Sequence, residues 1–250
     1  NVNGRFEVNW EELERMLSDD RTKLFILCNP QNPTGRVFTR EELTRMGNLC
    51  IKHHVTVIAD EIHQDVVYSG HKHIPFASIC PEFAEITVSF MNPSKTFNVP
   101  GFRTAAFIAS NPVLKSAVHE MLVNNKAIGE NICGTIAFYT AYEQCDYYAD
   151  QLVAYLEKNR DLVEQTLKDV PGIEVTHAEG TYLLWLDCRG LGFESQKALD
   201  KWLVEIAKLG FNSGMSFGPE GEGYARMNIA APRSTVEEAL HRLTNAVKAL

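Results

Sequence analysis

The sequences VTVIADEIHQDVV, residues 55–67, and ITVSFMNPSKTFNVPGFR, residues 86–103, decide the fold of this chain. Each contains a short apolar run that breaks at polar residues, proline or glycine, and such runs predict strands buried on both faces of a parallel sheet. Asp60, Lys95 and Arg103 each follow a strand end. Because ligands of open α/β sheets bind outside the carboxyl ends of the strands, one crevice is expected to hold all three charges.

The lysine in this set suggests a specific chemistry. A lysine amine can condense with a carbonyl group, and pyridoxal phosphate supplies an aldehyde for that purpose. The same cofactor needs a carboxylate at its ring nitrogen and cationic or hydroxyl partners for its phosphate. Lys95, Asp60, and Ser94 with Arg103 match these needs in turn. Taken alone, without further motifs, Asp60 and Lys95 fit an ordinary ion pair at a strand end better, because such structural pairs are common.

Four motifs in order extend this pattern along the chain. They are Asn29-Pro-Gln-Asn32-Pro-Thr-Gly35, Ala59-Asp-Glu-Ile-His63-Gln-Asp65, Ser94-Lys95-Thr-Phe-Asn98 with Arg103, and Tyr224-Ala-Arg226-Met-Asn228. Their order and spacing resemble the pyridoxal-phosphate enzymes of the aspartate aminotransferase fold, the class I/II aminotransferase superfamily. The Asp-Glu-Ile-His form most resembles the branch of MalY/PatB-like cystathionine β-lyases and related C–S lyases. The resemblance runs over essentially the whole sequence.

The resemblance implies a role for each matching residue. Lys95 is the lysine that binds the cofactor aldehyde, Asp60 faces the ring nitrogen, and Ser94 and Arg103 hold the phosphate. Asn32 binds the ring oxygen and the substrate carboxylate, Arg226 binds the same carboxylate, and His63 lies beside the cofactor. From composition alone, the segment around Asn32 is equally consistent with a rigid loop. The histidines at 71 and 73, with Asp65, lack the further ligands of a metal centre, and no metal is expected.

The expected fold class is α/β. We expect residues 1–154 to form the C-terminal part of a mainly parallel-sheet, pyridoxal-phosphate-binding large domain, and residues 155–250 to form a smaller α+β domain. The boundary falls within a predicted helix at 148–167. Other predicted helices span 10–17, preceded by Asn9 or Asn3, a segment after a Thr39–Glu42 capping box, and 196–209. Predicted strands span 24–27, 55–59, 87–90, 105–109, 173–176, 182–187 and 225–230.

The composition indicates a small-molecule enzyme. The chain has 250 residues, 45% of them hydrophobic, and a formal net charge of -8. A negative field does not favour nucleic acid or an anionic membrane as a partner. The six cysteines show no C-x-x-C spacing, which favours a reducing, cytoplasmic location.

The resemblance implies a pyridoxal-phosphate-dependent C–S β-lyase that converts cysteine thioethers to thiol, pyruvate and ammonia. Two alternatives remain open on the residues: an aminotransferase of an amino acid, and a non-catalytic fragment or regulatory interaction module. Members of the family carry a further N-terminal portion with a phosphate loop and an aromatic residue against the cofactor. We therefore expect this sequence to be the C-terminal part of a homodimeric enzyme, inactive by itself.

Overall fold

The computed structural model describes residues 1–2, 4–127, 129 and 131–250. Its contacts group the chain into two compact units, which are treated separately below. The N-terminal unit consists of Val8–Pro30 and Val37–Leu152, and the C-terminal unit of Asn1–Glu7, Gln31–Arg36 and Val153–Leu250. The chain therefore passes between the units several times. The division into domains at 154 and 155 remains a prediction.

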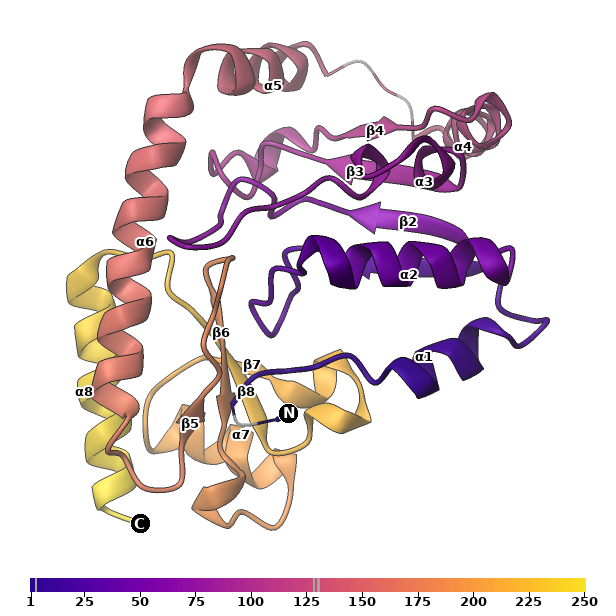
Figure 1. The fold of residues 1–250 in the computed structure, drawn as a ribbon. Helices are drawn as coiled ribbons and strands as arrows, with labels where there is room; N and C mark the ends of the chain where they lie inside the picture. Colours follow the sequence, from indigo (N-terminus) through magenta and orange to yellow (C-terminus); the bar gives the residue numbers. More distant parts are fainter. Residues whose placement is uncertain (3, 128, 130) are drawn as a thin grey trace. The chain divides into compact units, whose positions relative to one another are not determined.

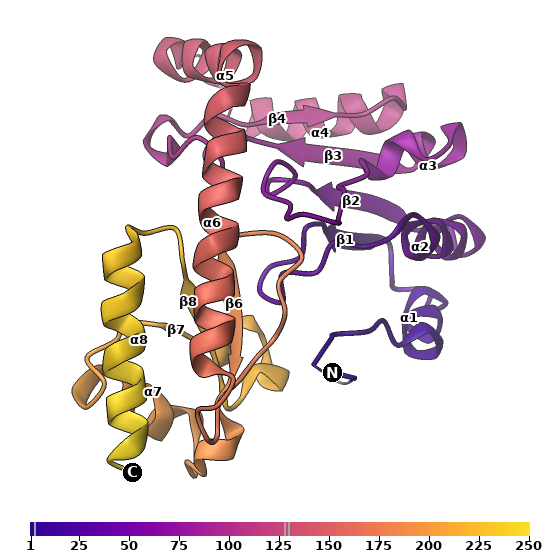
Figure 2. The ribbon, with the colours of Figure 1, turned by 60° about the vertical axis from the view of Figure 1, so that its left-hand side comes forward.

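The N-terminal unit contains a four-stranded sheet in the order β1-β2-β3-β4 (Figures 1 and 2). The strands are β1 (Leu24–Cys28), β2 (Thr56–Asp60), β3 (Thr87–Met91) and β4 (Ala106–Ile108). The first three run parallel, whereas β4 runs antiparallel to β3. The predicted α/β class with a mainly parallel sheet is thus confirmed.

Helices α1 to α5 and the start of α6 complete this unit. Their bounds are α1 (Trp10–Leu17), α2 (Arg40–Lys52), α3 (Pro81–Glu85), α4 (Pro112–Asn124), α5 (Ile132–Gln144) and α6 (Asp146–Leu167). The side chain of Asn9 caps α1 by accepting a hydrogen bond from the backbone N–H of Glu12. The alternative cap Asn3 lies outside the described residues. The predicted capping box of Thr39 and Glu42 is present at the start of α2.

One face of β1 differs from the prediction. The core of the unit packs α1, α2 and α3 against the sheet and buries Leu27 of β1 together with Val57 and Ala59 of β2. On the same strand β1, however, Leu24 is 57% exposed and Ile26 is 68% exposed. The expectation of a buried strand at 24–27 therefore holds for one face only, because this apolar run packs against the described residues on one side.

The C-terminal unit has an antiparallel sheet in the order β5-β6-β8-β7. Its strands are β5 (Glu174–Val175), β6 (Leu183–Asp187), β7 (Asn212–Ser213) and β8 (Tyr224–Asn228), and its helices, besides the end of α6, are α7 (Gln196–Glu205) and α8 (Arg233–Lys248). Both views show the C-terminal half of α6 beside α8 (Figures 1 and 2). Asn159 of α6 donates hydrogen bonds to the carbonyls of Ile229 and Ala231, which fixes this helix to the end of β8.

Two predicted features of this unit need correction. The predicted helix at 196–209 ends at Glu205, and Lys208 adopts a left-handed backbone with φ 56°, which a helix does not allow. The short strand β7 was not predicted, because two residues carry no readable alternation of polar and apolar side chains. Among the described residues, no helix has both the length and the apolar character that crossing a bilayer requires.

Candidate active site

The carboxyl ends of β2 and β3 bring the predicted cofactor residues of the N-terminal unit to one edge of the sheet. Asp60, the last residue of β2, is paired in register with Phe90 of β3, and Lys95 follows four residues after the end of β3. Because β4 is antiparallel, its first residue, Ala106, pairs with the last residue of β3. Arg103 thus reaches the same edge by preceding a strand, whereas Asp60 ends one and Lys95 follows one.

Asp60 is only partly exposed. Its carboxylate accepts a hydrogen bond from the backbone N–H of Ile62 at 3.3 Å. Burial raises the pKa of this carboxyl, and the Ile62 hydrogen bond and the positive charge of Lys95 oppose that rise. Lys95 therefore lies near enough to act on Asp60 through its field. Among the described residues, no carboxylate lies within 4.0 Å of the Lys95 amine, so the two do not form a closed ion pair.

The remaining predicted residues of this unit surround the same loops. Ser94 is half-buried, and its backbone N–H donates to Asn92 Oδ1 at 3.0 Å. Arg103 is exposed and adopts a left-handed backbone with φ 49° at the end of a short 3₁₀ turn. None of the carboxylates in the described ranges pairs with its guanidinium. His63 is 2% exposed and lies on the loop after β2.

The C-terminal unit brings together the other two predicted residues. Arg226 of β8 donates from Nη1 to Asn32 Oδ1 at 2.8 Å and from Nη2 to Asn212 Oδ1 at 3.0 Å. Its guanidinium carbon lies 4.8 Å from the centroid of the Phe217 ring. Burial lowers the pKa of Arg226. All of these contacts are neutral, so the charge of this partly buried guanidinium has no carboxylate partner among the residues described.

Other arginines of the same unit behave differently. Arg36 pairs with Glu179, Arg160 with Asp161, and Arg189 with Asp187. A guanidinium fork matches the two oxygens of a carboxylate, and a partly buried charge without a counter-charge favours binding such a group. The arrangement around Arg226 is therefore suited to an anionic ligand.

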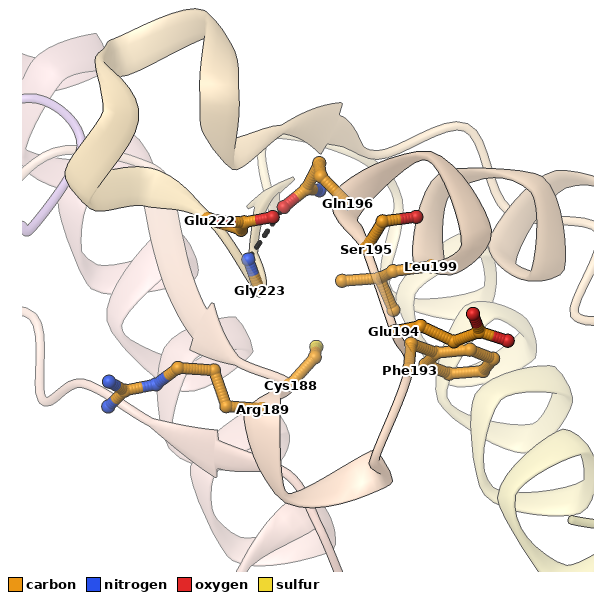
Figure 3. A pocket seen from close by; sticks show the side chains of 9 residues that line it. All are labelled: Cys188, Arg189, Phe193, Glu194, Ser195, Gln196, Leu199, Glu222 and Gly223. Carbon is orange, nitrogen blue, oxygen red and sulfur yellow. Dashed lines mark hydrogen bonds between the residues drawn. The ribbon is translucent and has the colours of Figure 1, made fainter.

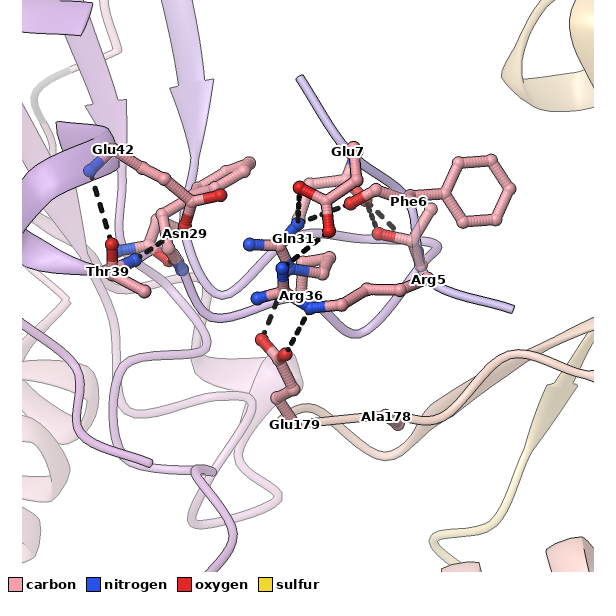
Figure 4. Close-up of polar contacts among 12 residues, drawn as sticks. Arg5, Phe6, Glu7, Asn29, Gln31, Arg36, Thr39, Glu42, Ala178 and Glu179 are labelled. Atoms are coloured by element: carbon pink, nitrogen blue, oxygen red, sulfur yellow. Dashed lines mark hydrogen bonds and ion pairs between the residues drawn. The ribbon is translucent and has the colours of Figure 1, made fainter. Parts of the chain in front are cut away.

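The loop that carries Asn32 is anchored by a buried ion pair. Figure 4 shows Arg36 and Arg5 converging on the carboxylate of Glu179, at 3.3 Å and 3.1 Å. The carbonyl of Gly35 accepts hydrogen bonds from the backbone N–H groups of Glu179 and Gly180, both at 2.9 Å. Gly35 has φ 73°, and a Cβ atom there would lie 2.7 Å from Ala178 Cβ. The loop conformation consequently depends on both the ion pair and the glycine.

Sequence reasoning missed Asn212, Phe217 and Glu179. Asn212 and Phe217 contact Arg226 from a region that shows only turn residues in the sequence. Glu179 contacts Arg36 from 143 positions away, a separation that no local pattern encodes. The available signal for Asn212 and Phe217 was the motif Tyr224–Asn228, because it contains Arg226, which both residues contact.

A separate pocket in the C-terminal unit contains none of the predicted site residues. It has a volume of about 320 Å³ and is lined by Cys188, Arg189, Phe193, Glu194, Ser195, Gln196, Leu199, Glu222 and Gly223 (Figure 3). Burial raises the pKa of the Cys188 thiol to about 12, so this thiol stays protonated and is a poor nucleophile. Gln196 is satisfied by Gly223, Asp200 and the carbonyl of Tyr224.

Comparison with known proteins places these features in one family. The family model described as aminotransferase class I and II matches residues 1–243. The chain belongs to this family. The resemblance of the four motifs to class I/II aminotransferases, and to the branch of cystathionine β-lyases, is thereby confirmed.

Curated and solved aminotransferase-family members show the same relationship. Cystathionine beta-lyase PatB of Bacillus subtilis is 37% identical over 98% of this chain, and protein MalY of Escherichia coli is 34% identical over 96% of it. The chain spans 63% and 61% of the lengths of these two relatives. The crystal structure of cystalysin from Treponema denticola, which contains a pyridoxal 5'-phosphate cofactor, superposes with a TM-score of 0.96 at 31% identity. That alignment covers 99% of this chain and 63% of cystalysin.

Proposed function

We propose that the protein to which this chain belongs is a pyridoxal-phosphate-dependent C–S β-lyase, which eliminates a thiol from cysteine thioethers and releases pyruvate and ammonia. The observation that carries this proposal is the placement of Asp60 at the end of β2 and of Lys95 four residues after the end of β3, the adjacent parallel strand. The name of the relative PatB, a cystathionine beta-lyase, favours elimination over transamination.

The residues at the edge of the sheet fit the cofactor. Asp60 is a half-buried carboxylate without a cationic hydrogen-bond partner among the residues described, which suits a protonated ring nitrogen. Lys95 and Arg103 are cations that no described carboxylate neutralises, which leaves the amine for an aldehyde and the guanidinium for a phosphate. Ser94 adds a hydroxyl next to the lysine. His63 is proposed as a neighbour of the cofactor only on the basis of the resemblance.

The cofactor supplies, when bound, an aldehyde for amines and a protonated ring that accepts an electron pair from the α-carbon. Asp60 would hold the cofactor at its ring nitrogen and would favour a proton on that nitrogen. Lys95 Nζ would take the α-proton of the substrate, a role that the lack of a closed ion pair leaves available. Arg226 and Asn32 bind the α-carboxylate of the amino acid through a two-pronged guanidinium contact and an amide N–H. The thiolate would leave from the β-carbon with the electron pair of the broken C–S bond and take up a proton, and water would hydrolyse the remaining unsaturated amino acid to pyruvate and ammonia.

A homodimer is proposed for the complete protein. On α5, the side chains of Ile132, Ile136 and Tyr139 are 70%, 60% and 62% exposed, although the helix is mostly apolar. An exposed apolar helix face favours association with another protein surface. A second copy of this chain is the partner that the family resemblance implies, and sedimentation of the complete protein would test it.

The lysine assignment is tested by covalent trapping. The complete protein is incubated with pyridoxal phosphate, reduced with borohydride and digested, and the adduct is located by peptide mass spectrometry. We expect it on Lys95 and expect Lys95→Ala to abolish it, whereas Lys115→Ala, on exposed α4, leaves it unchanged. An adduct that persists in Lys95→Ala would overturn the assignment.

The reaction type is tested separately with cystathionine. Release of thiol and pyruvate in the absence of an added keto acid supports a β-lyase. Strict dependence on a keto acid would instead identify an aminotransferase. A complete protein that traps the cofactor on Lys95 but releases neither product would point to the interaction-module alternative.

A further inference from the structure

Tyr142 of α5 links the two loops that carry Asp60 and Lys95. Its hydroxyl lies 3.2 Å from Asp65 Oδ2, on the loop after β2, and 3.1 Å from the carbonyl oxygen of Asn92, on the loop after β3. The single hydroxyl proton is thus within reach of an acceptor on each loop. One side chain from a distant helix therefore fixes the spacing of the two loops.

Asp65 makes a second connection to the lysine loop. Thr96, the residue after Lys95, donates its hydroxyl to Asp65 Oδ2 at 3.0 Å and is 1% exposed. Asp65 lies on the same loop as Asp60, five positions further along the chain. The carboxylate of Asp65 consequently connects the loop that follows Asp60 directly to Thr96, the residue after Lys95.

The ring of Tyr142 completes the arrangement. It meets the ring of Phe97 edge-on, with centroids 5.6 Å apart, and packs against Phe138 with centroids 5.1 Å apart. The residues held by Asp65 and Tyr142 are therefore Asn92 on one side of Lys95 and Thr96 with Phe97 on the other. Such contacts on both sides restrict where the lysine side chain can reach.

The contacts of Asp65 favour a role in positioning over a role in stability alone. Its partners are two hydroxyl groups, and no cation of the described residues lies within 4.0 Å of it. Burial raises the pKa of Asp65, which means that keeping the carboxylate ionised there opposes folding. A carboxylate that is buried at such a cost, beside a proposed catalytic lysine, is best explained by the groups that it orients.

We propose that Asp65 and Tyr142 are positioning residues, which together with Thr96 set the location and reactivity of the Lys95 amine relative to Asp60. The proposal deepens the proposed function and rests on it for the role of Lys95. It makes no claim that Asp65 or Tyr142 touches substrate.

The test measures the reactivity of Lys95 without cofactor. The complete protein is labelled with acetic anhydride at several pH values between neutral and alkaline, and the rate at Lys95 is compared with that at exposed Lys115 by peptide mass spectrometry. In Asp65→Asn, Thr96→Val and Tyr142→Phe, we expect the rate of Lys95 labelling to change by about fivefold, the effect of one lost hydrogen bond on a local equilibrium.

Two controls separate positioning from general destabilisation. Thr87→Val removes a buried hydroxyl that donates to the carbonyl of Phe83 at 2.6 Å, away from the lysine loop, and is expected to leave the Lys95 rate within about twofold. Thr96→Ser keeps the hydroxyl and is expected to restore the wild-type rate. Unchanged Lys95 rates in Asp65→Asn, Thr96→Val and Tyr142→Phe, or an equal change in Thr87→Val, would overturn the proposal.

This measurement is independent of the proposed function. A protein that fails to trap pyridoxal phosphate but shows the expected Lys95 changes would retain the positioning network and lose the cofactor assignment. A protein that traps the cofactor on Lys95, but whose Lys95 labelling rate is the same in the variants of Asp65, Thr96 and Tyr142, would keep the cofactor assignment and lose the positioning proposal.

Discussion

The guanidinium of Arg226 donates a 2.8 Å hydrogen bond to the side-chain oxygen of Asn32, although 194 positions separate the two residues in the chain. This bond joins the only two proposed substrate-binding residues of the C-terminal unit. Because Asn32 uses its oxygen for Arg226, its amide N–H₂ group is left to donate to a ligand. The pair therefore presents donors to an anion from two segments of the chain.

Replacing Arg226 with lysine should weaken binding of the substrate carboxylate. Lysine keeps the charge but loses the planar fork and its bonds to Asn32 and Asn212, so we expect affinity for an amino-acid ligand to fall about 10- to 100-fold. Titration of the cofactor-loaded complete protein, followed by absorbance, measures this. Arg189→Lys, which alters an arginine already paired with Asp187, is the matched control and should have little effect. Equal losses in both variants would contradict the assignment.

Glu179→Gln should destabilise the protein far more than Arg5→Gln. The Arg36 and Glu179 side chains are 2% and 6% exposed. Breaking a buried ion pair costs about 3–5 kcal/mol, and because Glu7 also lies 3.9 Å from the Arg36 guanidinium, we expect a loss at the lower end, about 3 kcal/mol. The Arg5 side chain is 41% exposed, and its loss should cost less than about 1 kcal/mol. Urea unfolding of the two variants measures the difference. Similar losses would mean that the buried pair is not what anchors the Asn32 loop.

His73 should make stability sensitive to mild acid. Burial lowers the pKa of His73 to about 4, below its ordinary value of 6.5. As the pH falls from 6.5 to 4, the unfolded chain takes up a proton at this residue and the folded chain does not, so stability is lost in that window by up to about 3 kcal/mol. The raised pKa of nearby Glu61 acts in the opposite direction and reduces the net loss.

The measurement is the free energy of unfolding in urea at pH 7, 5.5 and 4.5. His73→Gln should flatten the dependence on pH, whereas His71→Gln, at an exposed position two residues away, should leave it as in the wild type. A slope that is the same in both variants would show that His73 does not take part.

Gly35→Ala should destabilise the protein by more than an alanine at another glycine with a left-handed backbone does, because it also disturbs the loop that carries Asn32. Gly35 and Gly70 both have left-handed backbones, with φ 73° and 86°, but only Gly35 has neighbours within reach of a new Cβ. We expect Gly70→Ala to cost about 1 kcal/mol and Gly35→Ala more than about 2 kcal/mol. Gly35→Ala should also weaken ligand binding at Arg226, which calorimetry on the complete protein would detect. Equal losses of stability in Gly35→Ala and Gly70→Ala would mean that the left-handed backbone alone, and not contact with Ala178, causes the loss.

Much of the fold could be predicted because its signals are local. Helix α1 has the predicted bounds, and the capping box at Thr39 and Glu42 begins α2 as expected. The strand ends at Asp60 and before Lys95 were also readable, since apolar runs stop there. The assignment of roles to Asp60, Lys95, Arg103, Asn32 and Arg226 depended on the motifs and stays a prediction.

The rest depends on contacts between distant segments. The exposed face of β1 at Ile26 was not predictable, because an apolar run has the same sequence whether one face or two are covered. Likewise, Tyr142 reaches Asp65 across 77 positions and Arg36 reaches Glu179 across 143. A tyrosine on a helix and a glutamate in a loop give no local indication of such partners, so only the folded arrangement identifies them.

The interleaved connectivity of the two units has a practical consequence for anyone who wishes to dissect this protein. A genetic cut between Leu152 and Val153 would leave Asn32 and Arg36 on the first polypeptide, while Arg226 and Glu179 would be on the second. Each half would be deprived of the other's hydrogen-bonding and ionic partners. Reconstitution from two such pieces would therefore require the short Gln31–Arg36 segment to be supplied in trans, and a single-chain format is the appropriate one for engineering.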